Sequence, residues 1–572
     1  MYSGNFDYDV IIVGAGISGL AAAYTIHEKD SNISFLVLEG NDRIGGRVQS
    51  TLINVGKSEK ELLDIGGQFI GTQQTHLMTL LKKLDIKLYE NVNNRGYTLG
   101  DFCEGNFYKT TTMPPIFGDT ATAQDIMQFL GTLESMSSKV SLENPLTIDD
   151  YTDLDSMTME AFMYNNLSYS FSRSYIRILI KMMCGAEPSD ISVLFFLVFC
   201  NSTEGLTNSY LRTKSGGKGY WAKNTAAEIC EKIATFIGNE NIKINNAVAA
   251  ITRSDICVLV RTAENEYKCR YVIMALPPEH ILKVHFFPPL NDLKYTVLKR
   301  MQYRPTVKYI VTYRREFWRD MDYNGDLYCC RNLRELFPIM TAYNVSRDGT
   351  AVITGLLDVD LAEKKENHKN AVLTQLAAYF GREALEPLDY VEKSWSDDTY
   401  FFDSCAVCFP PPKMMKTFTE IRRPLGRLYF AGAETATYWY GHMAGAAQAG
   451  FRAAIEVLYE LRPQCLTAQD FIDLKPRRTQ LQFYSTEEHA MRNDWIVVVE
   501  FCENPVVMGV ARRKPHISDI NRVRRLEFVR KYENEECGFW DKADEAKVVR
   551  CIFTILINCL ASILFIRTVS NG

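Results

Sequence analysis

The start of the chain alternates between apolar runs and glycine-rich or polar turns. Residues 9–14 form an apolar run that ends in glycine, and an Ala-rich stretch follows the turn. This succession predicts a buried strand, a tight turn and a helix. A second apolar run, residues 33–38, ends at Glu39. Together these segments predict a βαβ unit that opens the chain.

The pattern changes in the middle of the chain and then returns. Between residues 97 and 210, amphipathic stretches such as 170–183 and 191–200 predict helices, whereas short apolar runs over residues 242–274 predict strands. Residues 427–458 again predict a strand, a glycine turn and a long helix. Between residues 286 and 400 the expected elements are strands at 307–313 and 351–357 and a polar helix at 371–379.

Composition narrows the class of protein. The chain has 572 residues, of which 47% are hydrophobic, so it can bury a large core and exceeds one simple domain. Its formal net charge of -5 gives no global attraction to nucleic acid. The 15 cysteines show no metal-ligand spacing, so no metal site is expected. Because Met1 leads almost directly into the first strand, we expect no cleaved signal peptide and a cytosolic body with reduced thiols.

The first turn carries a candidate nucleotide site. It reads Gly14-Ala15-Gly16-Ile17-Ser18-Gly19, a GxGxxG motif that follows a strand, opens a helix and precedes Glu39 at a strand end. Gly14 and Gly16 let the backbone approach a pyrophosphate, and Gly19 lets the helix pack closely on the sheet. Glu39 can accept hydrogen bonds from ribose hydroxyls, while the helix N-terminus binds phosphates. The motif predicts a site for FAD or NAD; the alternative is an ordinary glycine turn.

Further motifs carry a resemblance to a known family. Residues 42–47 read Asp-Arg-Ile-Gly-Gly-Arg, residues 64–68 read Asp-Ile-Gly-Gly-Gln, and residues 429–437 read Tyr-Phe-Ala-Gly-Ala-Glu-Thr-Ala-Thr. In this order, over roughly residues 9–461, they resemble the flavin amine oxidase family and its monoamine oxidase branch. The resemblance implies an α/β fold in which a Rossmann-like FAD-binding domain is interleaved with a mixed-sheet and helical substrate domain.

The resemblance also implies which residues bind FAD. Arg47 would support the phosphates and the flavin, the segment around Gly432 and Glu434 would close over the ribityl chain, and Val248 would contact the adenine. Asn41 departs from the arginine that the family usually has at its position. The expected FAD contacts are Gly14, Ala15, Gly16, Ser18, Gly19, Glu39, Arg47, Gln68, Val248, Trp395, Ser404, Gly432, Glu434 and Met443.

The family's chemistry assigns a role to one lysine. Its members pass a hydride from the carbon beside an amine to flavin N5, and O2 reoxidises the flavin to give peroxide. The resemblance places Lys308, within the apolar run 307–313, at the family's lysine near N5. A lysine among apolar residues is costly to bury without partners. The alternative is a lysine on the solvated face of a half-buried strand.

Two positions depart from the monoamine oxidase pattern. In that branch a Trp precedes the flavin-linking Cys by nine positions, and a Tyr follows the Cys; counting from Trp395 gives Ser404 and Cys405. We therefore expect non-covalent FAD, although a gapped alignment would make Cys405 the linker. His442 stands at the second aromatic of the substrate cage, where it can act as a polar contact or only fill space. Cys405 and His442 are the expected substrate-pocket residues.

The C-terminal region has a different composition. Residues 551–566 are uncharged and mostly apolar between Arg550 and Arg567, which favours a short membrane anchor; a buried core helix is the alternative. Monoamine oxidases are similarly anchored in the outer mitochondrial membrane, and the endoplasmic reticulum is the other candidate. The expected domains are FAD-binding (1–90, 216–300 and 400–460), substrate (91–215 and 301–399), linker (461–547) and transmembrane tail (548–567).

Three functions compete. The first is an FAD-dependent amine oxidase that converts an amine and O2 to aldehyde, ammonia and H2O2, acts at a membrane and can form a homodimer. The second is a flavin-binding protein that has lost turnover and serves an interaction role at the membrane, as the altered cage suggests. The third is a polyamine or amino-acid oxidase, although no clamp for an anionic substrate is evident in the sequence.

Overall fold

The computed structural model divides into two compact units, residues 1–465 and 466–572. It describes residues 5–58, 60–91, 95–101, 107–111, 115–209, 212, 216–302, 306–329, 338–358, 368–395, 409–473, 484–485, 494–501, 504–511 and 564–571. All residues of the site lie in the first unit.

The expected βαβ unit is confirmed. Strand β1 (Tyr8–Val13) leads through the glycine turn into helix α1 (Ile17–Lys29), and β2 (Phe35–Leu38) returns parallel to β1. The last four residues of β1 and all four of β2 are apolar and buried, as expected of parallel strands whose two faces are covered. Strand β13 (Glu266–Met274) flanks β1 on its other side, also in parallel register.

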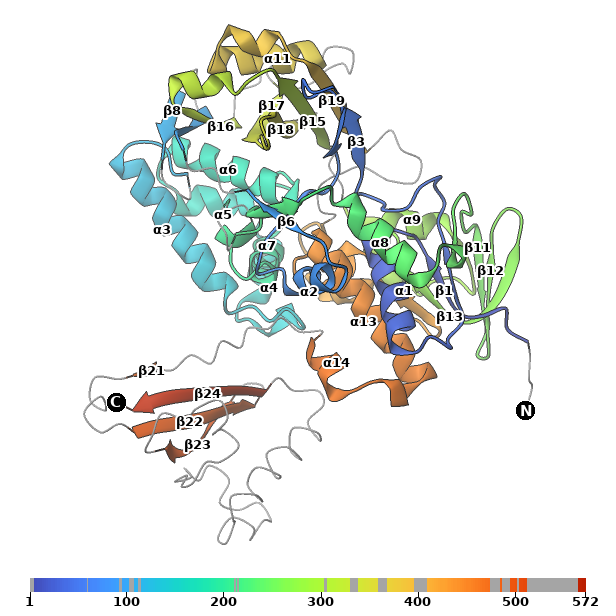
Figure 1. The fold of residues 1–572 in the computed structure, drawn as a ribbon. Helices are drawn as coiled ribbons and strands as arrows, with labels where there is room; N and C mark the ends of the chain where they lie inside the picture. Colours follow the sequence, from blue (N-terminus) through green and yellow to red (C-terminus); the bar gives the residue numbers. More distant parts are fainter. Residues whose placement is uncertain are drawn as a thin grey trace. The chain divides into compact units, whose positions relative to one another are not determined.

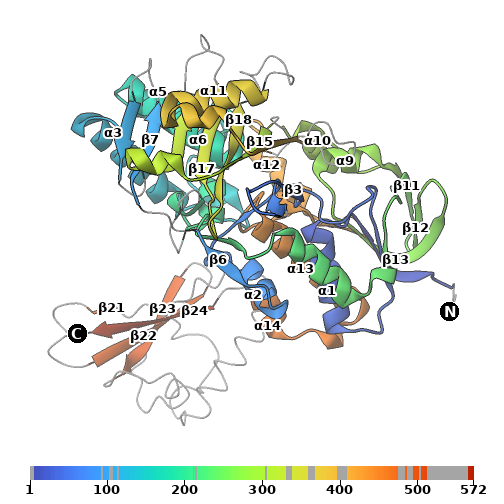
Figure 2. The same cartoon turned by 45° about the horizontal axis from the view of Figure 1, so that its top comes forward.

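This first sheet draws its strands from three distant segments. Its order is β10-β2-β1-β13-β12-β11-β14, and β20 pairs with β13. The further strands are β10 (Ile242–Lys243), β11 (Ala250–Arg253), β12 (Val258–Arg261), β14 (His285–Phe287) and β20 (Leu428–Phe430). The strands expected over residues 242–274 and after residue 427 are therefore confirmed. The same part of the unit contains the helices α2 (Thr75–Lys83), α8 (Ala227–Ile237), α9 (Pro278–Lys283), α10 (Asp292–Arg300) and α12 (Met415–Phe418), each labelled in Figure 1 or Figure 2.

Helix α13 (Met443–Leu461), near the end of the first unit, packs against helix α1 near its start. Figure 1 shows the two helices side by side. The approach is close at Gly450, where an added Cβ would lie 2.2 Å from the carbonyl oxygen of Ser18. Only glycine permits such contact between two helix backbones without displacement.

A second sheet has the order β19-β15-β18-β17-β16-β7-β8. Its strands are β7 (Tyr97–Asp101), β8 (Phe107–Thr110), β15 (Thr306–Tyr313), β16 (Tyr323–Cys329), β17 (Ile339–Asn344), β18 (Ala351–Asp358) and β19 (Asp389–Ser394). Helix α11 (His368–Phe380) covers one face (Figure 2) and contributes Val372, Leu376 and Phe380 to a core shared with β15 and β18. The helix expected at 371–379 is thus present, but it is more buried than its polar character predicted.

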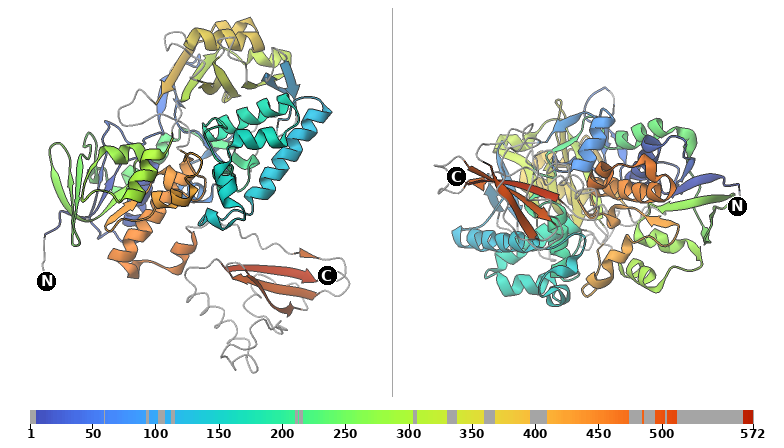
Figure 3. Two further views of the ribbon diagram at one scale, coloured as in Figure 1. Left: turned by 180° about the vertical axis from the view of Figure 1, so that it is seen from behind. Right: turned by 90° about the horizontal axis from the view of Figure 1, so that it is seen from below.

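The helical part of the substrate domain comprises α3 (Thr120–Ser137), α4 (Tyr151–Ser156), α5 (Met159–Asn166), α6 (Ser170–Cys184) and α7 (Val193–Ser202). Figure 3 shows these helices beside the second sheet from behind. The helices predicted at 170–183 and 191–200 are confirmed, with one correction. Helix α7 is not amphipathic, because all ten of its residues are buried. Short strands complete this unit: β3 (Ser50–Ile53) with β4 (Glu61–Asp64), and β5 (Phe69–Ile70), β6 (Leu88–Glu90) and β9 (Tyr220–Ala222) together.

The second unit begins with α14 (Ala468–Asp473) and contains a sheet of order β21-β24-β22-β23. These strands are β21 (Tyr484–Ser485), β22 (Asp494–Phe501), β23 (Asn504–Ala511) and β24 (Leu564–Asn571). Of the expected membrane segment, residues 548–563 lie outside the described residues, and the last four, 564–567, belong to a strand rather than to a helix. Among the helices that the structure describes, none has the length and apolarity needed to cross a membrane.

Candidate active site

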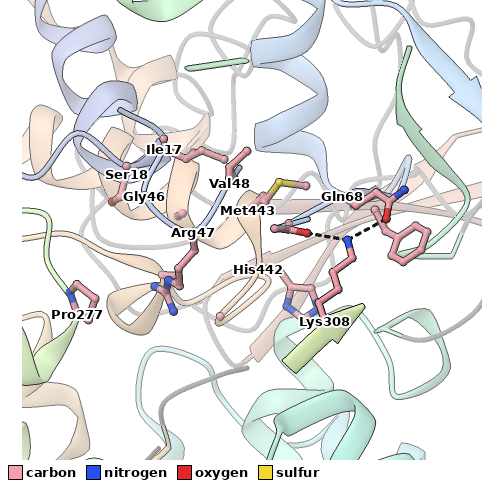
Figure 4. Close-up of a pocket in the computed structure, with 18 of the residues that line it drawn as sticks. Ile17, Ser18, Gly46, Arg47, Val48, Gln68, Pro277, Lys308, His442 and Met443 are labelled. Atoms are coloured by element: carbon pink, nitrogen blue, oxygen red, sulfur yellow. Dashed lines mark hydrogen bonds between the residues drawn. The ribbon is translucent and has the colours of Figure 1, made fainter. Parts of the chain in front are cut away.

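A cavity of about 290 Å³ opens in the first unit, with lining residues from both the first and the second sheet regions. It is lined by the turn after β1, by the stretches 45–48 and 66–69, by Lys308 on β15 and by the start of α13. Figure 4 shows these side chains facing one another across the cavity. Segments that are hundreds of residues apart therefore meet at one site.

The glycine turn forms one end of the cavity. Gly14 has a φ of +104°, and a Cβ there would lie 2.7 Å from the carbonyl oxygen of Ala275. A Cβ on Gly19 would lie 1.9 Å from the carbonyl oxygen of Gly14, so α1 can pack on this turn only with glycine. Gly16 is the N-cap of α1 and has no side-chain cap. The first amides of α1 and the helix dipole are therefore available to an anion, as a pyrophosphate requires.

Glu39 closes the same end from the tip of β2. Its side chain is buried, with Oε2 accepting from the Ala15 amide at 2.7 Å and Oε1 accepting from the Asn41 amide at 2.9 Å. Burial raises the pKa of this carboxyl, although the backbone hydrogen bonds from Asn41 and Ala15 oppose that shift. Each carboxylate oxygen has a second lone pair, so Glu39 can also accept from ribose hydroxyls.

Arg47 and Glu434 join two of the expected cofactor segments. Arg47 Nη1 and Nη2 donate to the two carboxylate oxygens of Glu434 at 2.6 and 3.1 Å. Glu434 is buried beneath the cavity wall and does not line it, whereas Arg47 does. Nearby, the amide of Gly432 donates to Ser18 Oγ at 2.7 Å. These bonds fix the late segment against the N-terminal βαβ unit.

Lys308 is buried, which excludes the solvated-face alternative. Its Nζ donates to the carbonyl oxygens of Asp64 at 2.7 Å and Gly66 at 2.9 Å, and to Gln68 Oε1 at 3.0 Å. Strand alternation explains its direction, because its neighbours Val307 and Tyr309 point into the core on the other face of the sheet. The ammonium is thus held by three oxygens at the cavity wall, and Figure 4 shows its hydrogen bond to Gln68.

His442 also lines the cavity, immediately before α13. Its Nδ1 lies 2.9 Å from the carbonyl oxygen of Tyr440, and a carbonyl only accepts, so Nδ1 carries the hydrogen and Nε2 is the ring's acceptor. Burial lowers the pKa of this imidazole, which favours the neutral ring. The ring packs edge-on against Trp439 at 5.3 Å between centroids.

The structure separates the expected site residues into three groups. Those that line the cavity are Gly14, Gly16, Ser18, Glu39, Arg47, Gln68, Lys308, Gly432, His442 and Met443. Those that are described but do not line it are Ala15, Gly19, Val248, Trp395 and Glu434; Val248 is half-buried and Trp395 is buried beside Arg43. Ser404 and Cys405 lie outside the described residues.

Lys218 and Tyr343 are polar cavity residues that were not anticipated from the sequence, as are Ser209 and Thr354. Lys218, on a turn before β9, donates from Nζ to Tyr343 Oη at 2.8 Å, and both residues line the cavity. The glycines on either side of Lys218 were a signal, since they mark a turn that can bring a side chain into a site. Tyr343 carried no such signal, because a tyrosine in a strand is most often core.

The glycine cradle, the uncapped helix N-terminus and the buried carboxylate match what FAD requires at its nucleotide end. Sequence comparison decides the family, since the flavin containing amine oxidoreductase family matches residues 17–458. This chain is a flavin-containing amine oxidoreductase. The cofactor of the family is FAD and its reaction class is amine oxidation.

Individual relatives agree with this assignment. Flavin-containing amine oxidase B of Sus scrofa is 31% identical over 462 residues, which cover 79% of this amine oxidoreductase and 86% of that relative. The flavin-containing amine oxidase of Oncorhynchus mykiss is 33% identical over 466 residues, with 79% and 86% covered. The solved structure of cyclohexylamine oxidase from Brevibacterium oxydans matches at a TM-score of 0.73 and 25% identity, and covers 80% of this chain and 99% of its own.

Proposed function

We propose that this flavin-containing amine oxidoreductase converts an amine, O2 and water to an aldehyde, ammonia and H2O2, with Lys308 as its catalytic residue. FAD, when bound, would supply the hydride acceptor and the means to pass the two electrons on to O2. The protein supplies a closed site that positions the amine and holds a fixed positive charge. The observation that carries the proposal is the buried Lys308 Nζ at the wall of the cavity that the cofactor motifs line.

The hydrogen bonds of Lys308 support this role. Two of its acceptors are backbone carbonyls, which cannot move without displacing the stretch 64–66, and the third is Gln68 Oε1. A group held by three acceptors has lost its rotamer freedom before substrate arrives, so its charge acts on the reacting atoms without reorganisation. Gln68 lines the cavity as well and orients the same ammonium.

His442 would act on the amine. Its neutral ring offers Nε2 as an acceptor, because Nδ1 already donates to the carbonyl of Tyr440. Such an acceptor can take a hydrogen bond from an amine N–H and favour the neutral amine that loses a hydride. His442 would thereby replace an aromatic contact by a polar one.

Replacing Lys308 by Met tests the assignment. The Lys308→Met variant should retain flavin and slow flavin reduction or reoxidation by roughly 100-fold, the range for one positioned charged group. The matched control is Lys139→Met, at an exposed lysine outside the cavity, which should not alter either half-reaction. Stopped-flow absorbance separates the two steps, and unchanged rates in Lys308→Met would remove this lysine from the mechanism.

A flavoprotein without amine turnover is the second candidate, motivated by His442 at a cavity position where the resemblance implies an aromatic ring. A peroxide-coupled assay across primary, secondary and polyamines separates the candidates. Peroxide formation above the flavin-free control establishes the oxidase. Tight flavin binding with no peroxide from any amine establishes the non-catalytic flavoprotein.

FAD would be held without a covalent bond. The ungapped count from Trp395 places a serine at the linking position, and a hydroxyl is far less acidic and nucleophilic than a thiol. Acid precipitation should therefore release the flavin to the supernatant. Flavin that stays in the pellet and maps to a peptide containing Cys405 would assign that cysteine as the linker.

The membrane anchor is a proposal for residues 548–567, in the outer mitochondrial membrane with the body facing the cytosol. Its support is the uncharged run 551–566 between two arginines, which can snorkel to the interfaces. Deletion of residues 548–572 should move the protein from the membrane pellet to the soluble fraction. Sedimentation of the deleted protein after a salt wash would reject the anchor.

A further inference from the structure

Lys218 brings a second lysine into the cavity. Its Nζ donates to Tyr343 Oη at 2.8 Å and lies 4.3 Å from the centroid of the Tyr343 ring and 5.8 Å from that of Phe69. Phe69 follows Gln68, which accepts from Lys308, so both lysines border the same part of the cavity. Lys218 is therefore placed to meet the substrate rather than the nucleotide end of the cofactor.

Asp326, the carboxylate that acts on the pKa of Lys218, is already paired with another residue. Asp326 forms a buried ion pair with Arg212, and Asp326 Oδ1 also accepts from the Asn344 amide at 3.0 Å. Arg212 is held further by Asn91 Oδ1 at 2.7 Å and by the Asn344 carbonyl at 2.8 Å. The Arg212–Asp326 pair is neutral as a unit, so Asp326 is not a dedicated partner of Lys218 within the part of the chain that the structure describes.

At the end of the cavity where Lys218 lies, the other charged lining residue that the structure describes is Lys308, which has the same sign. Among the cavity-lining residues that the structure describes, Glu39 is the one carboxylate, and it lies at the nucleotide end. Arg47 is neutralised by Glu434. Burial, and then the nearby Arg212, lowers the pKa of Lys218 to about 7, and the opposing effect of Asp326 does not offset them.

We propose that Lys218 is a specificity-determining residue that binds an anionic group of the substrate, so that the preferred substrate is an amine that also carries a carboxylate. A carboxylate would receive a charge-assisted hydrogen bond from Nζ while Tyr343 Oη orients the lysine. The methylene stem of such a substrate would lie against Phe69 and Met182, which also line the cavity. A polycation would meet Lys218 and Lys308 and would be disfavoured.

This inference rests on the proposed amine oxidase function, but its first test needs only bound FAD. The full-length holoprotein is titrated at pH 7 with 3-phenylpropanoate and with its neutral amide, 3-phenylpropanamide, and the flavin absorbance spectrum is followed. We expect the carboxylate to bind about 10-fold to 100-fold more tightly than the amide, as one charge-assisted hydrogen bond gives. Equal affinity, or tighter binding of the amide, would overturn the proposal without any variant.

Substitutions assign the preference to Lys218. In Lys218→Met the dissociation constant of the amide divided by that of the carboxylate should fall to about 1. In Lys218→Arg, which keeps the positive charge, much of the preference for the carboxylate should remain. The matched control is Lys223→Met, at an exposed lysine four residues from the turn glycine 219, which should keep the wild-type ratio. An unchanged ratio in Lys218→Met would reject this lysine as the anion-binding residue.

Turnover then tests the substrate class. Peroxide formation is compared for 6-aminohexanoate and hexylamine, and the wild-type kcat/KM should favour the amino acid by about 10-fold or more through a lower KM. A preference for hexylamine would overturn the substrate assignment. If neither amine nor any other is oxidised while the carboxylate preference in the spectral titration depends on Lys218, the proposed oxidase function fails and the anion site stands.

Discussion

Glu39 combines two tasks in one side chain. Its oxygens accept from the Ala15 and Asn41 amides, and they face the cavity at the nucleotide end. Glu39→Gln places an NH2 group against one of these amides and removes the charge, so FAD binding should weaken by about 1.5–3 kcal/mol. Equilibrium dialysis of FAD measures the loss, with exposed Glu264→Gln as the control. Undiminished flavin content in Glu39→Gln would contradict the assignment of β2 to the ribose.

Asp64 makes folding stability depend on pH. Burial raises the pKa of this carboxyl from 3.8 to about 6, against the opposing effects of Lys308 and of the hydrogen bond from the Ala226 amide. Between these values the folded protein keeps a proton that the unfolded chain has lost. The stabilising contribution is therefore complete below pH 3.8 and is lost as the pH rises through about 6.

Asp64→Asn tests this dependence, because asparagine does not titrate. The difference in unfolding free energy, wild type minus variant, should fall by about 1–3 kcal/mol as the pH rises from 4 to 6.5. Urea unfolding of the holoproteins at several pH values measures it. A difference that stays constant or rises over this window would contradict the raised pKa.

A site residue could be identified from the sequence when its neighbours along the chain set it apart. Glu39 and Lys308 stood out because a strand end and an apolar strand pattern are properties of the neighbouring sequence. Lys218 and Tyr343 meet only when β9 and β17 are brought together, and no spacing along the chain encodes that. Val248 was expected at the adenine from the resemblance, whereas in the structure it is half-buried and does not line the cavity.

At the scale of elements, α1 shows why the glycine motif needs its third member. The Gly19→Ala change puts a Cβ 1.9 Å from the carbonyl oxygen of Gly14, so the helix must shift from the turn that it shapes. We expect Gly19→Ala to lose about 2–4 kcal/mol of stability and most of its flavin, as overpacking against backbone does.

The control for this change is another helical glycine. Gly131 in α3 is exposed, and an added Cβ there meets nothing within 4 Å. Gly131→Ala should therefore stabilise the protein by about 0.5–1 kcal/mol through helix propensity. Thermal unfolding and flavin content compare the two variants. Equal behaviour of Gly19→Ala and Gly131→Ala would show that helix propensity, not the close approach of α1 to its turn, determines the outcome.

The positions of helices and strands were easier to predict than the extent to which other elements cover them. The periodicity of residues 191–200 indicated a helix, but α7 is buried on every side because α3, α4 and α5 enclose it. A short apolar segment gives the same sequence pattern whether one face or all faces are covered. The pattern of β15, by contrast, left the direction of Lys308 open; in the structure Val307 and Tyr309 lie in the core, so alternation directs Lys308 to the other face.

At the scale of the whole molecule, the site is assembled from the two ends of the first unit. Arg47 and Glu434 are 387 residues apart, yet they form a bidentate ion pair, and α13 packs on α1. The resemblance implied that both segments bind FAD, but not that Arg47 and Glu434 pair. Periodicity could not show it either, because it contains no information on which strand lies beside which. The composition of the second unit likewise gave no indication of the sheet formed by β21–β24.

This arrangement predicts where the chain can be cut. All described residues that line the cavity precede residue 447. Helix α13 ends at Leu461, and its Arg452 donates from Nη2 to the Phe430 carbonyl at 2.7 Å and to Thr435 Oγ1 at 2.9 Å. A chain that ends at Cys465 keeps these contacts, so it should bind flavin at the full-length ratio and unfold within about 2–4 °C of the full-length protein, a change of at most ~1 kcal/mol. A chain that ends at His442 lacks α13, exposes the apolar face of α1 and should lose flavin and cooperative unfolding. Flavin absorbance and calorimetry are compared for the full-length chain and the two shortened chains. Loss of flavin from the chain that ends at Cys465 would mean that the second unit supports the site. Retention of flavin by the chain that ends at His442 would mean that α13 does not support it.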